Sequence, residues 1–169
     1  GDQVDLSCSS LSSLQSLTDI FGRTFPTNTL HSIVITGSRL GPLPNDIFQG
    51  KSFEIITFSN NRYTSFDTSG IFSSSNGRLK SLTVRQDTDD WNFQLSSIEQ
   101  LIVLTDLELS GYNMALLGKV ASQTLVSLTL RSDLLTSVPN LGTLPSLETL
   151  NLDGSVIASL SSNQFTGFT

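Results

Sequence analysis

The hydrophobic and polar positions of this chain follow one tract that returns along its whole length. Each copy begins with an apolar residue, two variable residues and a second apolar residue. One variable residue, a third apolar residue, two variable residues and a polar residue follow. The clearest copy is Leu125-xx-Leu128-x-Leu130-xx-Asp133-x-Leu135. The middle apolar positions of the seven copies lie 21 to 29 residues apart: Val4, Ile33, Ile56, Leu82, Leu107, Leu128 and Leu150. A period in the twenties predicts a solenoid, because one such unit cannot bury its apolar face without a neighbour.

The apolar centre of each tract predicts one short strand. Side chains alternate between the two faces of a strand, so the three apolar residues point inward and the residues between them point outward. Stacking the tracts gives a parallel sheet of about seven strands. The connections, including the unpatterned stretches 15–28 and 88–101, are expected to be loops and short helical turns. The apolar spacing of Ser96–Leu104 predicts one short helix there.

The tract resembles the leucine-rich repeat, and the resemblance covers essentially the whole chain. It implies an α/β solenoid with a parallel sheet on the concave face and loops and short helical turns on the convex face. In this family an Asn at the polar position bonds the turn after the strand, and only Asn61 is the expected residue here. Ser and Asp can bond the backbone in a similar way, whereas Tyr112 cannot do so as readily. The other copies carry Ser9, Ser38, Asp87, Asp133 and Ser155 at this position.

Four copies also carry a later Phe, which resembles the phenylalanine stack of extracellular leucine-rich repeats: Phe21, Phe48, Phe72 and Phe165. The resemblance implies that they fill a layer behind the sheet, with Leu117/Val120 and Val138/Leu141 replacing Phe in two other copies. The pairs Leu40/Leu43, Leu135/Val138 and Ile157/Leu160 are expected in the same layer. The Ser-, Thr- and Phe-rich composition is similar to that of secreted invertebrate repeat proteins, so we expect an extracellular chain.

The register predicts three columns of side chains on the concave face. The first contains Gln3, Ser32, Ile55, Ser81, Asp106, Ser127 and Thr149; the second contains Asp5, Val34, Thr57, Thr83, Glu108, Thr129 and Asn151; the third contains Ser7, Thr36, Ser59, Arg85, Ser110, Arg131 and Asp153. These columns are rich in hydroxyls, and only the two Arg residues belong to the types that dominate protein interfaces. We therefore expect a protein or a polar, carbohydrate-like partner here. The expected contact residues are Thr57, Thr83, Arg85, Glu108, Thr129, Arg131, Asn151 and Asp153.

Composition narrows the choice of partner. The net charge of −6 and the nine scattered basic residues argue against nucleic acid, which requires clustered Lys and Arg. No apolar stretch reaches the length of a membrane span. Ser and Thr make up 46 of the 169 residues, which fits either a solvated β-rich surface or O-glycosylation. The sequence contains no Asn-x-Ser/Thr site for N-glycosylation.

Cys8 is the single cysteine of the chain. It follows the predicted Val4–Leu6 strand, so we expect it near the surface. An odd cysteine in a secreted protein suggests a disulfide partner outside the segment, and an unpaired small side chain is the alternative interpretation.

The sequence offers no convergent set of catalytic groups. His31 is interpreted as a surface side chain, and one His and one Cys far apart cannot form a nucleophilic or His-ligated metal site. Asp87, Asp89 and Asp90 lack the spacing of a calcium loop and are interpreted as a solvated turn. Asp106 and Glu108 are alternate residues of one strand, with nothing to enclose a substrate. We therefore expect no enzyme activity, no cofactor and no metal.

Residues 1–169 are expected to form a single solenoid without a polar cap at either end, because Val4 already lies inside a copy and Phe168 matches the start of another. This pattern fits a fragment of a longer protein, the ordered part of one, or a unit that stacks on copies of itself. Three functions remain open. The first is a secreted, non-enzymatic leucine-rich repeat scaffold that binds a protein or glycan. The second is a structural subunit that stacks end to end into a filament, and the third is an accessory subunit of a secreted enzyme such as a luciferase.

Overall fold

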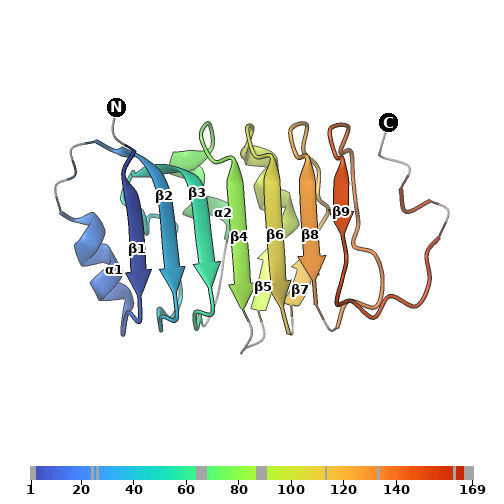
Figure 1. Ribbon diagram of the computed structural model, residues 1–169, viewed down its shortest axis with the longest axis horizontal. Helices are drawn as coiled ribbons and strands as arrows, with labels where there is room; N and C mark the ends of the chain where they lie inside the picture. The colour runs from blue at the N-terminus through green and yellow to red at the C-terminus, as the bar shows by residue number, and fades with distance from the viewer. Residues whose placement is uncertain are drawn as a thin grey trace.

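The computed structural model describes residues 3–23, 25, 27–63, 68–86, 91–112, 114–132, 134–161 and 163–165. Parallel strands dominate it, with few helices (Figure 1). The strands are β1 (Asp5–Ser9), β2 (Thr29–Thr36), β3 (Ser52–Ser59), β4 (Ser81–Gln86), β5 (Trp91–Gln94), β6 (Asp106–Gly111), β7 (Met114–Leu117), β8 (Ser127–Arg131) and β9 (Thr149–Asn151). The helices are α1 (Leu14–Phe21) and α2 (Thr68–Ile71), with the short 3₁₀ helices η1 (Ser73–Ser75) and η2 (Leu95–Gln100).

Seven strands form one open parallel sheet in the order β1-β2-β3-β4-β6-β8-β9. Chain order and spatial order therefore agree, and β1 and β9 lie at opposite edges (Figure 1). β5 and β7 pair with each other in a separate parallel ribbon, which is drawn behind the lower part of the large sheet in Figure 1. The connections carry the helices, and in this view α1 lies beside β1. The prediction of one parallel sheet built from the repeated tracts is confirmed.

The predicted register is confirmed from β2 to β9. Leu107 pairs with Leu128, and Glu108 pairs with Thr129 one residue later. The same alignment runs through every neighbouring pair, so Val34, Thr57, Thr83, Glu108, Thr129 and Asn151 form one row across the sheet. Six of the seven copies of the tract were thus aligned correctly by the spacing of their apolar residues.

The predicted register of β1 is wrong by two residues. Leu6 pairs with Ile33 and Cys8 with Ile35, whereas the sequence pattern aligned Val4 and Leu6 with these positions. Asp5, Ser7 and Ser9 therefore occupy the three columns in place of Gln3, Asp5 and Ser7. The physical reason is that Cys8 serves as the third inward side chain, and a small thiol packs as a hydrophobic group.

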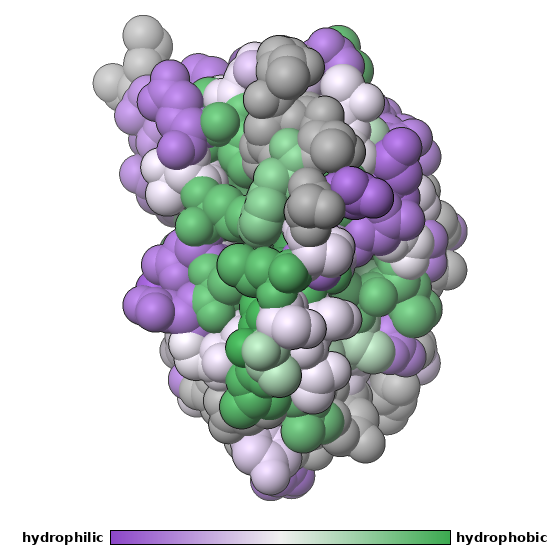
Figure 2. Space-filling view, turned by 90° about the vertical axis from the view of Figure 1, so that its right-hand side faces the viewer, coloured by the Kyte–Doolittle hydropathy of each residue, from purple (hydrophilic) through white to green (hydrophobic). Residues whose placement is uncertain are grey.

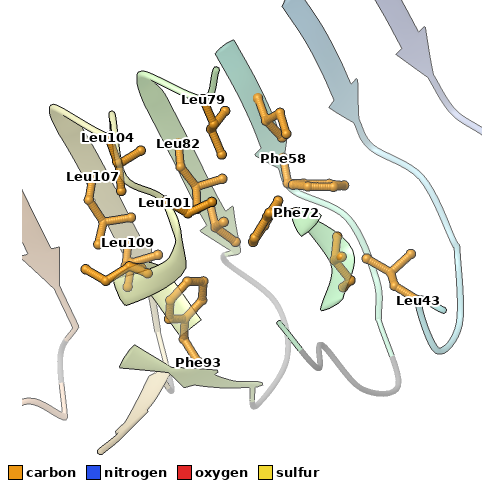
Figure 3. Packing of buried hydrophobic residues seen from close by; sticks show 14 of the residues in the cluster. Leu43, Phe58, Phe72, Leu79, Leu82, Phe93, Leu101, Leu104, Leu107 and Leu109 are labelled. Atoms are coloured by element: carbon orange, nitrogen blue, oxygen red, sulfur yellow. The ribbon is translucent and has the colours of Figure 1, made fainter. Parts of the chain in front are cut away.

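The sheet is buried on one face only. In β6, Leu107 and Leu109 are fully buried, while Glu108 between them is partly exposed. β8 repeats this alternation with Leu128 and Leu130. Figure 3 shows Leu82, Leu107 and Leu109 pointing away from the open face, toward the connections that carry Phe72, Phe93 and Leu101. This packing confirms the prediction that Leu107 and Leu128 lie in the core on adjacent strands.

A layer of aromatic rings lies behind the first strands. The ring centroids of Phe21 and Phe48 are 5.6 Å apart and perpendicular, and Phe48 also contacts Phe53 at 5.1 Å. Phe72 is buried as expected, but Phe165 is 40% exposed. Among the predicted replacements, Val120 and Val138 are buried and Leu141 is partly buried, whereas Leu117 is exposed. Leu160 of the pair Ile157/Leu160 is exposed as well. The Leu40/Leu43 pair is buried, and Leu135 and Ile157 are partly exposed. The layer thus becomes less complete toward the last strand.

Exposed hydrophobic side chains gather at the β9 end. Val156 and Leu160 are 56% and 63% exposed, and Leu147, Leu150 and Leu152 of the same copy are only partly buried. Figure 2 looks onto this end, and a band of hydrophobic residues runs down its middle between polar flanks. The last copy of the tract therefore leaves part of its apolar surface open to solvent.

Two connections differ from the sequence prediction. The first is the stretch 15–28, most of which up to Phe21 belongs to α1. Leu17 and Phe21 of this helix are buried in the core, and Ser13 accepts a hydrogen bond from the Ser16 amide at its start. The helix expected over 96–104 is the 3₁₀ helix η2, which ends at Gln100. The β5–β7 ribbon was not predicted, because Trp91 and Phe93 lie in a stretch without the repeated tract.

In two copies, at Ser38 and Asn61, the polar position of the tract ties adjacent turns together. Asn61 accepts a hydrogen bond from the Ser38 amide at 2.9 Å and donates from Nδ2 to the Ile35 carbonyl at 2.8 Å. The Ser38 hydroxyl in turn accepts from the Leu11 amide at 3.0 Å. Buried Asn61 and Ser38 thus satisfy backbone groups that would otherwise lose their hydrogen bonds to water.

Candidate functional site

The open face of the sheet carries the residues that lie between the buried positions. From β2 to β9 they are Ser32, Val34, Thr36, Ile55, Thr57, Ser59, Ser81, Thr83, Arg85, Asp106, Glu108, Ser110, Ser127, Thr129, Arg131, Thr149 and Asn151. Hydroxyl groups dominate this set, and none of the side chains is aromatic. The predicted contact residues Thr57, Thr83, Glu108, Thr129 and Asn151 occupy one row of five consecutive strands. The sheet therefore brings them together as a continuous polar strip.

The two predicted arginines have different surroundings. Arg85 donates from Nε to Oε1 of Glu108 at 2.8 Å and from Nη2 to Oε2 at 2.6 Å. This two-point geometry orients both side chains, because a guanidinium fork matches a carboxylate. Arg131, two strands further on, is exposed and forms no ion pair with any described residue. Arg131 is consequently the arginine of the open face whose donors remain available.

A shallow hollow of about 570 Å³ lies at the carboxyl ends of β6, β8 and β9. It contains Arg131 and Asp153 from the predicted set and Ser110 from the same column. Asp153 lies beyond the end of β9, in the following turn, and is exposed. The described residues that line the hollow are Ser110, Gly111, Tyr112, Arg131, Ser132, Asp153 and Gly154.

Tyr112 is the large side chain among the residues of this hollow that the sequence prediction missed as contact residues. Its side chain is 62% exposed, whereas the other tyrosine, Tyr63, is buried. The sequence carried a signal, because Tyr112 stands at the position where the tract otherwise has Ser, Asn or Asp. A large aromatic side chain cannot turn back to bond the backbone, so it projects from the loop instead.

The amino ends of β2–β4 carry a charged cluster that was also not predicted. Glu54 accepts hydrogen bonds from Arg78 Nη2 at 2.9 Å and from Lys80 Nζ at 3.0 Å. Nδ1 of His31 lies 4.0 Å from the same carboxylate. The hydrogen bond from Lys80 is the main reason that the pKa of Glu54 lies below its ordinary value, and the charges of Lys80 and Arg78 add to it. His31 therefore lies beside a carboxylate and is not simply a surface side chain.

The expectation that Cys8 lies near the surface is wrong. Cys8 lies within β1, is 7% exposed and belongs to the same core cluster as Ile33 and Ile35. Burial raises the pKa of its thiol, because the thiolate would lose its hydration. The fold therefore holds Cys8 as a free, buried thiol, and a disulfide to a residue outside the segment stays a prediction.

Catalytic and metal-binding groups do not converge in the described part of the chain. Among those residues, no three of His, Cys, Asp and Glu lie close enough to hold a metal ion. Asp106 and Glu108 lie on the open face of β6 as expected. Asp87, Asp89 and Asp90 fall outside the described residues, as do Asp133 and Phe168. None of the described helices combines the length and the apolar character that crossing a bilayer requires.

These features describe an open parallel-sheet protein whose exposed face is polar and hydroxyl-rich. The chain is similar to the Oplophorus-luciferin 2-monooxygenase non-catalytic subunit of Oplophorus gracilirostris, with 27% identity over 169 residues. The similarity covers 98% of this chain and 47% of that protein, so the chain spans about half the length of the curated relative that it matches. No protein family model matches the chain, and no solved structure matches it. The relative is named as a non-catalytic subunit.

Proposed function

We propose that this chain is a secreted, non-enzymatic accessory subunit, built as a leucine-rich repeat solenoid, that binds its partner through the open face. The observation that carries the proposal is the similarity along 98% of the chain to a protein named as the non-catalytic subunit of a luciferin monooxygenase. The described residues support it, because the open face offers a continuous row of small polar side chains. A catalytic chain of an enzyme is the protein partner that the relative's name favours.

The open face suits a stable but polar interface. Thr83, Glu108 and Thr129 lie next to one another on β4, β6 and β8, and all three are partly exposed. The short side chains of Thr83 and Thr129 lose little conformational entropy when a partner covers them. The Arg85–Glu108 pair is already ordered before binding, which reduces the cost of forming an interface over it.

Purification of the native protein without denaturant tests this proposal. We expect the chain to sediment together with a second chain at a constant ratio, and the enzyme activity to follow that second chain. Thr129→Arg, in the middle of the open face, is expected to release the partner. Gln100→Arg adds the same charge at an exposed position of η2 and serves as the matched control.

Two results would overturn the proposal. One is a chain that sediments alone at its own mass in a native preparation, with no second chain at a constant ratio. The other is a loss of the partner in Gln100→Arg but not in Thr129→Arg, which would place the interface on the connections behind the sheet.

A second candidate function, end-to-end assembly, is favoured by the exposed apolar side chains at the β9 end (Figure 2). In this proposal the occupant of that end is the β1 edge of a second copy. Such a contact would continue the same parallel sheet, and because it joins unlike surfaces it would grow as a filament. Sedimentation over a wide range of protein concentration distinguishes the two functions.

If the chain assembles end to end, the mass measured by sedimentation should rise with protein concentration for the unmodified chain. It should not rise for the variant that carries Val156→Ser and Leu160→Ser. Ile102→Ser changes an equally exposed residue in the turn before β6 and is expected to have no effect. A constant monomer mass would overturn this second candidate.

A further inference from the structure

The hollow at the ends of β6, β8 and β9 differs from the rest of the open face. It combines one exposed aromatic ring with one cation, one anion and two serine hydroxyls, from Tyr112, Arg131, Asp153, Ser110 and Ser132. We propose that this hollow binds a short neutral saccharide. The inference deepens the proposed function and rests on it for the role of the open face as a binding surface.

The Tyr112 ring supplies the apolar part of such a site. Its 62% exposure leaves much of the side chain in water, beside a face whose other side chains are small and mostly polar. An aromatic ring combines an apolar face with a polar hydroxyl, and it suits a ligand that is itself apolar on one side and polar on its rim. A pyranose ring has this character, because its C–H groups share a face and its hydroxyls point outward.

Arg131, Asp153 and Ser110 supply the polar contacts. Arginine only donates hydrogen bonds, a carboxylate only accepts them, and a serine hydroxyl does both. A hydroxyl-bearing ligand satisfies all three groups at once, because each of its hydroxyls is a donor and an acceptor. Neither Arg131 nor Asp153 forms an ion pair in the described part of the chain, so neither group has to break one to bind.

The loops that carry these side chains are held in place by described contacts. The Ser132 hydroxyl donates to the Tyr112 carbonyl at 3.4 Å. The Asp153 amide donates to Oδ1 of Asn151 at 2.9 Å, so Asn151, itself a predicted contact residue, holds the backbone that carries Asp153. Gly154 follows with a φ of +74°, a conformation that glycine adopts without strain. A site formed before the ligand arrives loses less affinity to ordering.

The charges argue for a neutral ligand. Asp153 repels a phosphate or carboxylate, Arg131 repels an ammonium group, and the net charge of −6 disfavours polyanions. The volume of about 570 Å³ falls within the range of roughly 300–1,000 Å³ that small-ligand sites occupy. The hollow is open to solvent, which fits a ligand of a few rings bound from one side.

The experiment is a ¹H–¹⁵N titration of the purified chain with maltotriose, cellotriose and triacetylchitotriose as separate probes. We expect saturable shifts of the Gly111, Tyr112, Ser132 and Gly154 amides with at least one probe, at a dissociation constant on the order of millimolar. Tyr112→Ala is expected to weaken this binding by more than about tenfold, and Tyr112→Phe, which keeps the ring, by less than about threefold. Arg131→Ala is expected to weaken it by about tenfold.

Leu134→Ala removes an exposed apolar side chain from the loop after β8 without touching the hollow, and it should leave the binding unchanged. The amide spectrum of each variant shows whether it is folded.

No saturable shift with any probe, or equal binding by folded Tyr112→Ala, would overturn the proposal. The proposal would also be overturned if Tyr112→Ala lost a protein partner and the unmodified chain responded to none of the sugars. The hollow would then be a protein contact. Sugar binding without a second chain in the native preparation would instead overturn only the accessory-subunit proposal.

Discussion

Arg85 and Glu108 form a two-point ion pair across β4 and β6, with hydrogen bonds of 2.8 and 2.6 Å. They are diagonal neighbours, because Arg85 pairs with Ser110 and Glu108 pairs with Thr83 in the strand register. The guanidinium therefore lies over the open face. It reaches from the row that contains Arg85 and Ser110 to the neighbouring row that contains Thr83 and Glu108. This contact uses two donors of an arginine that the sequence predicts to bind a partner, whereas Arg131 forms no ion pair with any described residue.

We expect a measurable but small coupling between these two residues. Arg85→Ala and Glu108→Gln should each lower the free energy of unfolding by about 0.2–1 kcal/mol, because half of the Arg85 side chain remains exposed. The double variant should lose less than the sum of the two, since both remove the same contact. Urea denaturation of the four proteins measures this coupling, and strictly additive losses would show that the pair contributes nothing to stability.

The register of the sheet predicts a large contrast between adjacent residues. Leu107→Ala and Leu128→Ala each remove a buried side chain from the core and should cost about 2–5 kcal/mol. Thr129→Ala changes a partly exposed side chain of the open face and should cost about 0.5 kcal/mol or less. Denaturant unfolding measures all three, and a larger loss for Thr129→Ala would contradict the register, because a slip by one residue exchanges the two faces.

The sheet could be predicted because its determinants are local and repeated. Leu82, Leu107 and Leu128 recur at the same position of the tract, and each points inward for the same reason. β1 was misplaced because a pattern of Val and Leu does not reveal that Cys8 fills a core position. The β5–β7 ribbon has no repeat to reveal it, since Trp91 and Phe93 of β5 lie outside the tract, although Met114 of β7 is the last apolar position of a copy.

The candidate site was predictable only in part, for a related reason. Alternation along a strand places Glu108 and Thr129 on the open face, but it does not indicate which side chains bond to each other. The Arg85–Glu108 pair depends on side-chain rotamers. The hollow at Tyr112 depends on the path of three separate loops. Such relationships between loops are set by tertiary packing and have no periodic signature in the sequence.

The buried position of Cys8 predicts a slow thiol. Burial disfavours the thiolate, and the pKa of Cys8 lies above its ordinary value of 9.0, so the nucleophilic form is scarce near neutral pH. We expect Ellman's reagent to react with the native chain at least about tenfold more slowly than with the chain in urea. Equal rates in the two states would contradict a buried thiol. A chain from its natural source that shows no thiol even in urea would indicate the disulfide suggested by the odd cysteine.

The charged cluster around Glu54 predicts a pH-dependent contribution to stability. The pKa of Glu54 is lowered from 4.5, mainly by the hydrogen bond from Lys80, so the folded chain binds this proton less readily than the unfolded chain. The resulting stabilisation is present above pH 4.5 and is lost as the pH falls through the lower pKa of the folded state. Lys80→Met should therefore lower stability by about 0.5 kcal/mol at pH 7, and the gap should close in acid.

Urea denaturation between pH 7 and pH 3 measures this gap. Lys119→Met removes an exposed lysine that has no ion pair among the described residues, and its effect should not change over the acid range. A gap for Lys80→Met that persists unchanged at pH 3 would show that the lysine acts through packing rather than through the Glu54 charge.

The close approach of Gly111 to Trp91 predicts that β6 requires glycine at its end. A Cβ at this position would lie 2.4 Å from the Gln86 carbonyl oxygen and 2.5 Å from the Trp91 indole nitrogen, so the strand or the buried indole would have to move. Gly111→Ala should cost about 1–3 kcal/mol through this overpacking. Gly77→Ala is the matched control, because a Cβ there meets nothing within 4 Å, and it should be neutral or slightly stabilising. Since Gly111 precedes Tyr112, Gly111→Ala should also shift the NMR signals of the amides that line the hollow. An unchanged amide spectrum together with full stability would mean that β6 does not depend on this contact.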